Sequence, residues 1–200
     1  MRAFTALLAG PTVALAATIS RRAGSVPEDP WTAGVWRQPA TDNTFFVGDA
    51  INASSGKFYV HKDTSAYCPS EVDGLDCSLY PGSRTVFSGG NNTLSLDVGV
   101  PGGQQVYVAA DGSLSYTTAH SAALPEGAIA TGFSRERSES FGAPVVLGHS
   151  NQFWLMCPIT SEDEPRERTY QMYVGKSDKE GCLNTAVRTY TSSADSWEYA

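Results

Sequence analysis

Hydrophobic and polar positions alternate in short runs along most of this chain. The runs are separated by turns rich in Gly, Ser, Asn and Pro, and almost no long stretch follows the period of a helix. Strands are predicted at residues 44–47, 57–62, 84–87, 93–98, 104–109, 113–118, 144–147, 152–159, 170–174 and 186–191. We therefore expect an all-β protein.

Turn signals divide these runs. Asp111-Gly112 is the strongest, because an Asp-Gly pair supplies the positive φ that a tight hairpin needs. Weaker turns are expected at residues 53–56 and 89–92. Residues 133–141 and 161–168 mix charges of both signs at high density, so we expect solvated loops there.

A short motif recurs along the chain. Tyr-Val-x-Lys followed by Cys at the same spacing starts at Tyr59 and at Tyr173, and a further Tyr-Val pair starts at Tyr107. Three equivalent units closing on one another would form a β-trefoil. Tyr-Val is also ordinary strand composition, which leaves a sandwich or an open barrel as the alternative. We expect one compact domain of short antiparallel strands over residues 31–200.

The N-terminus predicts export. Met1-Arg2 precedes an apolar run over residues 3–17, and Ala14-Leu15-Ala16 provides a small-residue cleavage site. The run is too short to cross a membrane, which takes about 20 apolar residues. We expect a signal peptide at residues 1–16 and a flexible segment at 17–30, where Arg21-Arg22 resembles a dibasic processing site.

Charge narrows the classes of partner. The chain has 14 basic and 21 acidic side chains, a net charge of −7. Binding to nucleic acid depends on Lys and Arg neutralising phosphates, so nucleic acid and anionic membranes are poor candidates, and we expect no nucleic-acid partner. Residues 192–200 are polar and lack the hydrophobic tail of a lipid-anchor signal, so we expect no membrane anchor.

Four cysteines are expected to form two disulfides, since an even number in an exported chain is typical of oxidised pairs. Three connectivities are possible. We favour Cys68 with Cys77, which closes a turn-rich loop, and Cys157 with Cys182. Zinc is the alternative, but the spacings do not match its close Cys pairs.

Two sequons fit the same compartment. Asn52 and Asn91 each begin an Asn-x-Ser/Thr sequence within residues that favour turns. Both asparagines are therefore candidate glycosylation sites.

No catalytic pattern stands out. His61, His120 and His149 each lie near hydroxyl residues, but residues 148–152 lack the final glycine of a nucleophile elbow. No acidic pair, metal-binding pattern or phosphate-binding glycine loop is evident either, and residues 99–103 have no Lys-Ser/Thr after them. The sequence therefore predicts a protein that is not an enzyme and has no metal site or cofactor.

Carbohydrate binding needs no perturbed acid or base, because sugars stack on aromatic faces. Trp31, Trp36 and Trp197 lie in polar surroundings near the chain ends and are the candidate sugar-stacking residues. Trp154 lies in an apolar run and is expected in the core.

Two segments carry a family resemblance. Residues 102–128, which contain the Asp111-Gly112 turn, resemble the fungal cell wall protein PhiA family. Residues 51–60 are similar to that family's early glycosylated hairpin, and Cys68-Pro69 follows where its first cysteine segment stands. The likeness runs over much of residues 45–134, whereas residues 31–44 and 161–168 do not match it.

The resemblance implies a secreted cell wall protein linked to asexual development, namely the formation of phialides and conidia. Relatives are also described as IgE-binding antigens, and no enzyme activity comes with the family. The expected partners are wall polysaccharide or other wall proteins, and no oligomeric state is predicted. A secreted lectin-like module and a host-directed effector are the alternative functions.

Overall fold

The computed structural model describes residues 26, 30–36, 46–139, 142–175, 180–193 and 195–200. The predicted signal peptide at 1–16, Arg21-Arg22 and most of the segment 17–30 lie outside these residues, as does half of the predicted strand 44–47. The other half of that prediction, Phe46 and Val47, is not in a strand. The first strands are β1 (Trp31–Val35), β2 (Asn52–Ser54), β3 (Lys57–Val60), β4 (Ala66–Tyr67), β5 (Val86–Leu96), β6 (Gln104–Val108) and β7 (Leu114–Tyr116). They are followed by β8 (Thr131–Arg137), β9 (Val145–His149), β10 (Trp154–Pro158), β11 (Tyr170–Val174), β12 (Leu183–Thr185), β13 (Val187–Thr191) and β14 (Glu198–Tyr199).

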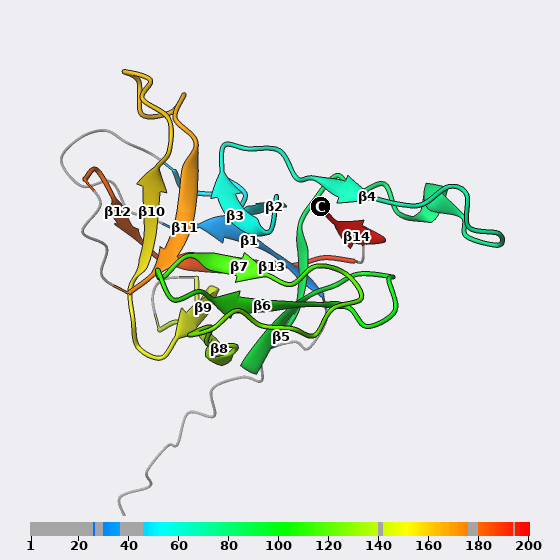
Figure 1. Ribbon diagram of the computed structural model, residues 1–200. Helices are drawn as coiled ribbons and strands as arrows, with labels where there is room; N and C mark the ends of the chain where they lie inside the picture. The colour runs from blue at the N-terminus through cyan, green and yellow to red at the C-terminus, as the bar shows by residue number, and fades with distance from the viewer. Residues whose placement is uncertain (1–25, 27–29, 37–45, 140–141, 176–179, 194) are drawn as a thin grey trace, which may run out of the picture.

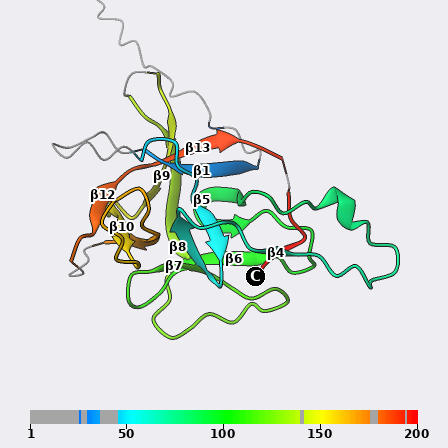
Figure 2. The same ribbon diagram turned by 90° about the horizontal axis from the view of Figure 1, so that it is seen from above.

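The fold is all-β, as the hydrophobic pattern predicted. A 3-10 helix, η1 (Cys77–Leu79), is the one helical element in the described part of the chain. The main sheet runs in the order β1-β13-β9-β8-β5-β6-β7-β3-β11-β10-β12, with antiparallel pairing throughout, and β4 and β14 form a separate pair (Figure 1). Because β1 also pairs with β5, the strands β1, β13, β9, β8 and β5 form a closed circuit (Figure 2).

Aromatic side chains link this circuit to the rest of the core. Trp31 and Phe87 stack with ring centroids 4.8 Å apart, and Phe58 continues the stack at 5.4 Å from Phe87. Tyr116 meets Phe58 edge-on at 5.3 Å. These residues come from four different strands, β1, β5, β3 and β7, so their burial depends on the pairing of segments far apart in the sequence.

The strongest predicted turn is confirmed. Asp111-Gly112 joins β6 to β7, which pair antiparallel. Gly112 has a φ of +81°, and the Ala109 N–H donates to Ser113 O at 2.9 Å across the turn. The Asp111 carboxylate accepts from the Ser113 N–H at 2.9 Å, as Asp side chains commonly do in turns.

The turn predicted at residues 89–92 is wrong. The predicted strands 84–87 and 93–98 belong to the single strand β5, which runs through it. Gly89, Gly90 and Asn92 have φ values of +83°, +99° and +72°, and the register with β8 shifts after Asn92. Positive φ at these positions produces a bulge that bends the strand without reversing it.

One of the two predicted charged loops is a strand. Residues 131–137 form β8, while the loop prediction holds for residues 161–168. Phe133, Arg135 and Arg137 alternate along β8 and so share one face, with Phe133 buried at its base. The end of β8 is exposed and carries charged residues on both faces, so the sequence there does not alternate between apolar and polar positions.

The recurring Tyr-Val motif is not a threefold repeat. Tyr59 on β3 lies opposite Gln171 on β11, the strand that also carries Tyr173, and the two strands are antiparallel neighbours. Units related by rotation about one axis run in the same sense along it, so these two strands are not equivalent copies. The cysteines that follow the two motifs also have unrelated partners.

Candidate functional site

Both disulfides have the pairing that the sequence favoured. Cys68 bonds to Cys77, nine residues away, within residues 66–82, which we name the arm. Cys157 on β10 bonds to Cys182, 25 residues away, just before β12. The first closes a peripheral loop, and the second joins a buried position of the main sheet to the segment that forms its edge strand.

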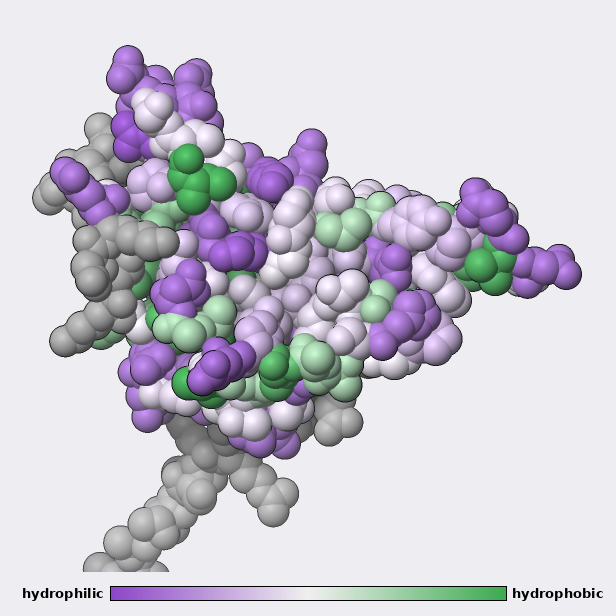
Figure 3. Space-filling model, in the orientation of Figure 1, coloured by the Kyte–Doolittle hydropathy of each residue, from purple (hydrophilic) through white to green (hydrophobic). Residues whose placement is uncertain are grey.

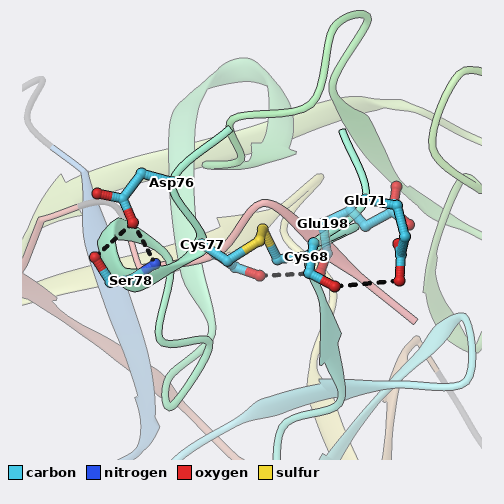
Figure 4. The surroundings of a disulfide bond; sticks show 8 residues. Cys68, Glu71, Asp76, Cys77, Ser78 and Glu198 are labelled. Carbon is cyan, nitrogen blue, oxygen red and sulfur yellow. Dashed lines mark hydrogen bonds between the residues drawn. A yellow bond between two sulfur atoms is a disulfide. The ribbon is translucent and has the colours of Figure 1, made fainter. Parts of the chain in front are cut away.

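The arm begins with β4, which pairs with β14, and projects from the body (Figure 1). Figure 4 shows its disulfide and the bonds that Asp76 makes to Ser78. Asp76 caps η1 by accepting from the Ser78 N–H at 3.0 Å and from its hydroxyl at 2.6 Å, and these bonds lower the pKa of the Asp76 carboxyl. Val72 and Leu79 are exposed on the arm. On the face shown in Figure 3, apolar residues are scattered among polar ones, which is ordinary for a protein surface.

Gln104 holds the C-terminal residues in place. Its amide nitrogen donates to Tyr199 O at 2.9 Å and to Thr117 O at 3.1 Å, and its amide oxygen accepts from the Tyr199 N–H at 2.8 Å. Gln104 is 1% exposed, so these bonds are shielded from water. The sequence analysis did not identify this role, and no local signal marks it, because the partner lies 95 residues away.

A second polar group fixes the same end of the chain. Asp195 is 3% exposed and accepts from the Arg84 N–H at 2.7 Å, the Ser83 hydroxyl at 3.2 Å and the Arg84 guanidinium at 3.2 Å. The Tyr199 hydroxyl donates to Arg84 O and accepts from the Val86 N–H, both at 2.8 Å. Burial raises the pKa of Tyr199, so this hydroxyl keeps its proton at physiological pH.

The candidate sugar-stacking tryptophans differ in access. Trp31 is wrong as a candidate, because it is 0% exposed, stacked on Phe87 and covered by the Arg135 guanidinium at 4.6 Å. Polar neighbours in the sequence suggested exposure, but strands β5 and β13 enclose it on both sides. Trp36 and Trp197 are half-buried, and sugar stacking by these two stays a prediction.

The two half-buried rings lie in different settings. Trp36 lies under the Arg188 guanidinium at 4.8 Å. Trp197 meets Tyr80 edge-on at 5.4 Å, and Gly99 leaves the space for both rings, since a Cβ there would lie within 3 Å of each. Trp154 is in the core, as predicted, with 4% exposure.

Two of the histidines form hydrogen bonds between separate segments of the chain. His61 Nε2 lies 2.9 Å from the Asp49 carboxylate, and its Nδ1 lies 2.9 Å from Arg168 O. Since both partners are acceptors, both bonds form together only when the ring carries two protons. His149 is buried, and its Nε2 donates to Thr131 O at 3.0 Å. Neither ring has a Ser or Thr hydroxyl among these hydrogen-bond partners.

The described residues contain neither a cluster of metal-binding side chains nor a membrane-spanning helix. Among them, no group of three or more His, Cys, Asp and Glu side chains is placed to hold a metal ion. No helix in the same residues is long and apolar enough to span a membrane.

Burial of His149 predicts a pH effect on stability. Desolvation lowers the pKa of the His149 imidazole below its ordinary value of about 6.5. As the pH falls below that value, the unfolded chain binds a proton that the folded protein does not, so stability decreases on acidification. His149→Gln should reduce the loss of the urea midpoint between about pH 7.5 and pH 5. His120→Asn, at an exposed position, is the control and should leave the loss unchanged; an unaltered loss in His149→Gln would contradict the prediction.

The two sequons are not equivalent, and both lie in strands where turns were expected. Asn52 is half-buried and its amide nitrogen, the atom that would carry a glycan, donates to Lys62 O at 2.8 Å. Asn91 is exposed on β5. We expect Asn91→Gln to remove glycan mass from the secreted protein and Asn52→Gln to change it little, as measured by glycopeptide mass spectrometry. High glycan occupancy on the Asn52 peptide would contradict this expectation.

One pocket carries a concentration of positive charge. It is about 360 Å³ in volume and lies between β8, β9 and β13. We name it the arginine pocket; its lining residues are Arg135, Arg137, Gly142, Ala143, Pro144, Val145, Arg188, Thr189, Tyr190 and Thr191. Residues 133–141 look like a solvated loop in the sequence, so no local signal marked this pocket.

The fold and its two disulfides define a small β protein of the kind found outside the cell. The chain belongs to the PhiA-like secreted protein family, whose model matches residues 46–200. The match continues through residues 161–168, where the sequence analysis found no likeness. It begins after Trp31 and Trp36, which agrees with the absence of likeness over residues 31–44.

One curated relative adds to this comparison. An uncharacterized secreted protein of Arthroderma benhamiae is 35% identical over 138 residues. The match covers 68% of this chain and 64% of that protein, so the chain spans less than two thirds of the relative's length. No solved structure matches the chain. The family and the relative both identify this chain as a secreted protein.

Proposed function

We propose that this protein is a non-catalytic component of the fungal cell wall that acts by adhering to wall polysaccharide or to other wall proteins. Membership of the PhiA-like secreted family is the observation that carries the proposal. The resemblance of residues 102–128 to the cell wall protein PhiA supports the wall as the site of action. A role in phialide and conidium formation is part of the proposal and depends on the same resemblance.

The use of polar side chains agrees with an adhesive role. Gln104, Asp195 and His61 are each hydrogen-bonded to segments far away in the sequence. Their bonds hold the fold together, and burial lowers the pKa of His149, which favours a neutral ring over a poised acid. These are structural uses of residue types that enzymes employ for catalysis.

Deletion combined with fractionation tests the proposal. Mycelium should retain the protein in its wall fraction until detergent or reductant is added, and a deletion strain should form abnormal conidiophores. Reintroducing the intact gene should restore them. A deletion strain with normal walls and spores, together with a protein found only in the medium, would contradict the proposal.

A neutral-sugar module is the second candidate. Trp197 and Tyr80 form a half-buried aromatic pair over Gly99, so the rings have fixed positions from which a sugar face could be bound. Binding on a glycan array that disappears in Trp197→Ala would favour this function. Phe153→Ala removes an exposed aromatic side chain that is not a candidate and is the control, which should leave the binding unchanged.

A further inference from the structure

The arginine pocket is a local positive site on a protein whose net charge is −7. Arg135 and Arg137 lie two positions apart on β8 and so share one face of that strand. Arg188 lies on β13, at least 51 residues further along the chain than Arg135 and Arg137. The fold brings it near them because β8 and β13 are both neighbours of β9. A cluster assembled from separate strands is a feature of the fold and not of one charged segment.

The pocket exists because two strands separate. β13 pairs with β9 only at Val187 and Arg188, and then the Thr189 hydroxyl donates to Val145 O at 3.3 Å. β8 stays paired with β9 as far as Arg137. Beyond these points the space between the strands is open, and residues 188–191 of β13 line one side of it.

The guanidinium groups have defined supports. Arg135 donates to the Thr189 hydroxyl at 3.3 Å and lies over Trp31, and Gly90 provides room for its stem, since a Cβ there would lie 2.6 Å from it. Arg188 lies over Trp36 at 4.8 Å and over Tyr190 at 5.0 Å. Such stacking limits the freedom that each side chain would lose on binding a ligand.

Arg137 and Arg188 keep guanidinium donors that could bind an anion. Arg137 donates to Ala143 O at 3.3 Å, and a guanidinium has five donor hydrogens, so most of its donors are left for a ligand. Among the described residues, the ion pairs join His61 to Asp49 and Arg84 to Asp195, and neither involves Arg137 or Arg188.

We propose that the arginine pocket binds an anionic sugar of an extracellular polysaccharide, through a carboxylate or phosphate group held by Arg137, with Arg135 and Arg188 adding positive charge to the lining. Guanidinium groups match the geometry of both anions. Tyr190 and Thr191 also line the pocket and add polar groups to a site for a sugar. Nucleic acid is a poor fit, because its dense charge needs an extended basic surface, and this protein is acidic outside the cluster.

The inference deepens the proposed function, since it names the chemistry by which the protein would bind the wall. Purified full-length protein is titrated at low salt with glucuronate, glucose 6-phosphate and glucose, with NMR detection of the arginine Nε–H signals. We expect one or both charged sugars to shift the Arg137 signal and glucose to leave it unchanged. The carboxylate and phosphate arms show which anion is the ligand.

Variants separate the pocket from overall charge. Arg137→Gln should weaken binding at least about tenfold, as expected for loss of a charge-assisted hydrogen bond. Arg166→Gln removes the same charge from the exposed loop 161–168 and should leave the affinity within about twofold. Equal losses in both variants, or no shift with either charged sugar, would overturn the inference.

Further outcomes distinguish an anionic sugar from free phosphate as the ligand. They also separate failure of this inference from failure of the proposed function. If inorganic phosphate binds as tightly as glucose 6-phosphate and glucuronate does not bind, the assignment to a sugar is wrong. If Arg137→Gln loses the charged sugars but stays fully in the wall fraction, the pocket is not what holds the protein in the wall, and the inference fails while the proposed function stands. A protein that binds charged sugars but is absent from the wall would uphold the pocket and contradict the function.

Discussion

Replacing Gln104 with Leu is expected to reduce the free energy of unfolding by at least about 3 kcal/mol, because it strands three backbone groups at a cost of about 1–3 kcal/mol each. The side chain bonds Tyr199 through both its N–H and its carbonyl and bonds Thr117 O as well. Leu fills the space but offers neither donor nor acceptor. Equilibrium unfolding in urea, followed by tryptophan fluorescence, measures the change.

The neighbouring residue provides a matched control. Gln105 is half-buried and bonds Thr117 through its backbone: its N–H donates to the Thr117 hydroxyl and its O accepts from the Thr117 N–H, both at 2.9 Å. Gln105→Leu makes the same chemical change on the opposite face of β6 and should alter stability by no more than about 0.5 kcal/mol. Similar losses in both variants would show that Gln104 has no special part in holding the C-terminal residues.

Removing the Cys157–Cys182 disulfide is the second large effect. With a sequence separation of 25, loss of loop-closure entropy predicts a decrease of about 3.5 kcal/mol. Cys157 is 1% exposed, so Ala is a better replacement than Ser, which would bury a hydroxyl. The double Ala variant should therefore unfold at a clearly lower denaturant concentration than the unmodified protein.

The arm supplies the comparison. Cys68 and Cys77 are nine residues apart, for which the same relation gives about 2.7 kcal/mol, and the arm lies at the periphery. When this disulfide is absent, the arm can loosen within the folded protein, which reduces the net loss further. We expect the Cys68/Cys77 double Ala variant to be the more stable of the two, and the reverse order would contradict the account.

The sequence predicted those features of the fold that depend on residues close together in the chain. Asp111-Gly112 defines its hairpin because both the turn conformation and the capping of Ser113 depend on adjacent residues. β11 (Tyr170–Val174) has the predicted bounds, since its five residues are all buried and form a continuous apolar run apart from Gln171. The favoured disulfide pairing followed from the turn-rich composition of the loop that Cys68 and Cys77 close.

Long-range pairing explains what the sequence did not predict. Trp31 has polar neighbours in the sequence but is enclosed by β5 and β13, which begin more than 50 residues later. Asp195 looks like part of a polar tail, and its partner Arg84 lies 111 residues away. Arg135 and Arg137 look like a solvated loop until β8 is paired with β5 and β9. In each case the deciding contact comes from another segment of the chain, which a local sequence pattern cannot identify.

The arginine pocket also depends on long-range strand pairing. Its charge could be counted from the sequence, but its position depends on β13 leaving β9 after Arg188. A bulge at Gly89 and Gly90 is also needed, because side chains at these positions would occupy the space of the Arg135 stem and the β5 backbone. The site therefore arises from irregularities of the sheet, which alternation patterns do not describe.

Binding of the purified protein to isolated fungal cell walls is the most direct test of the central claim, that this protein acts by adhesion. Washed walls are mixed with increasing amounts of folded, oxidised protein and sedimented, and the bound and free fractions are measured. We expect saturable binding that is lost after reduction and unfolding, and no chemical change in the wall material. Protein that stays in the supernatant at every concentration, or wall polymer that is cleaved during incubation, would contradict the account.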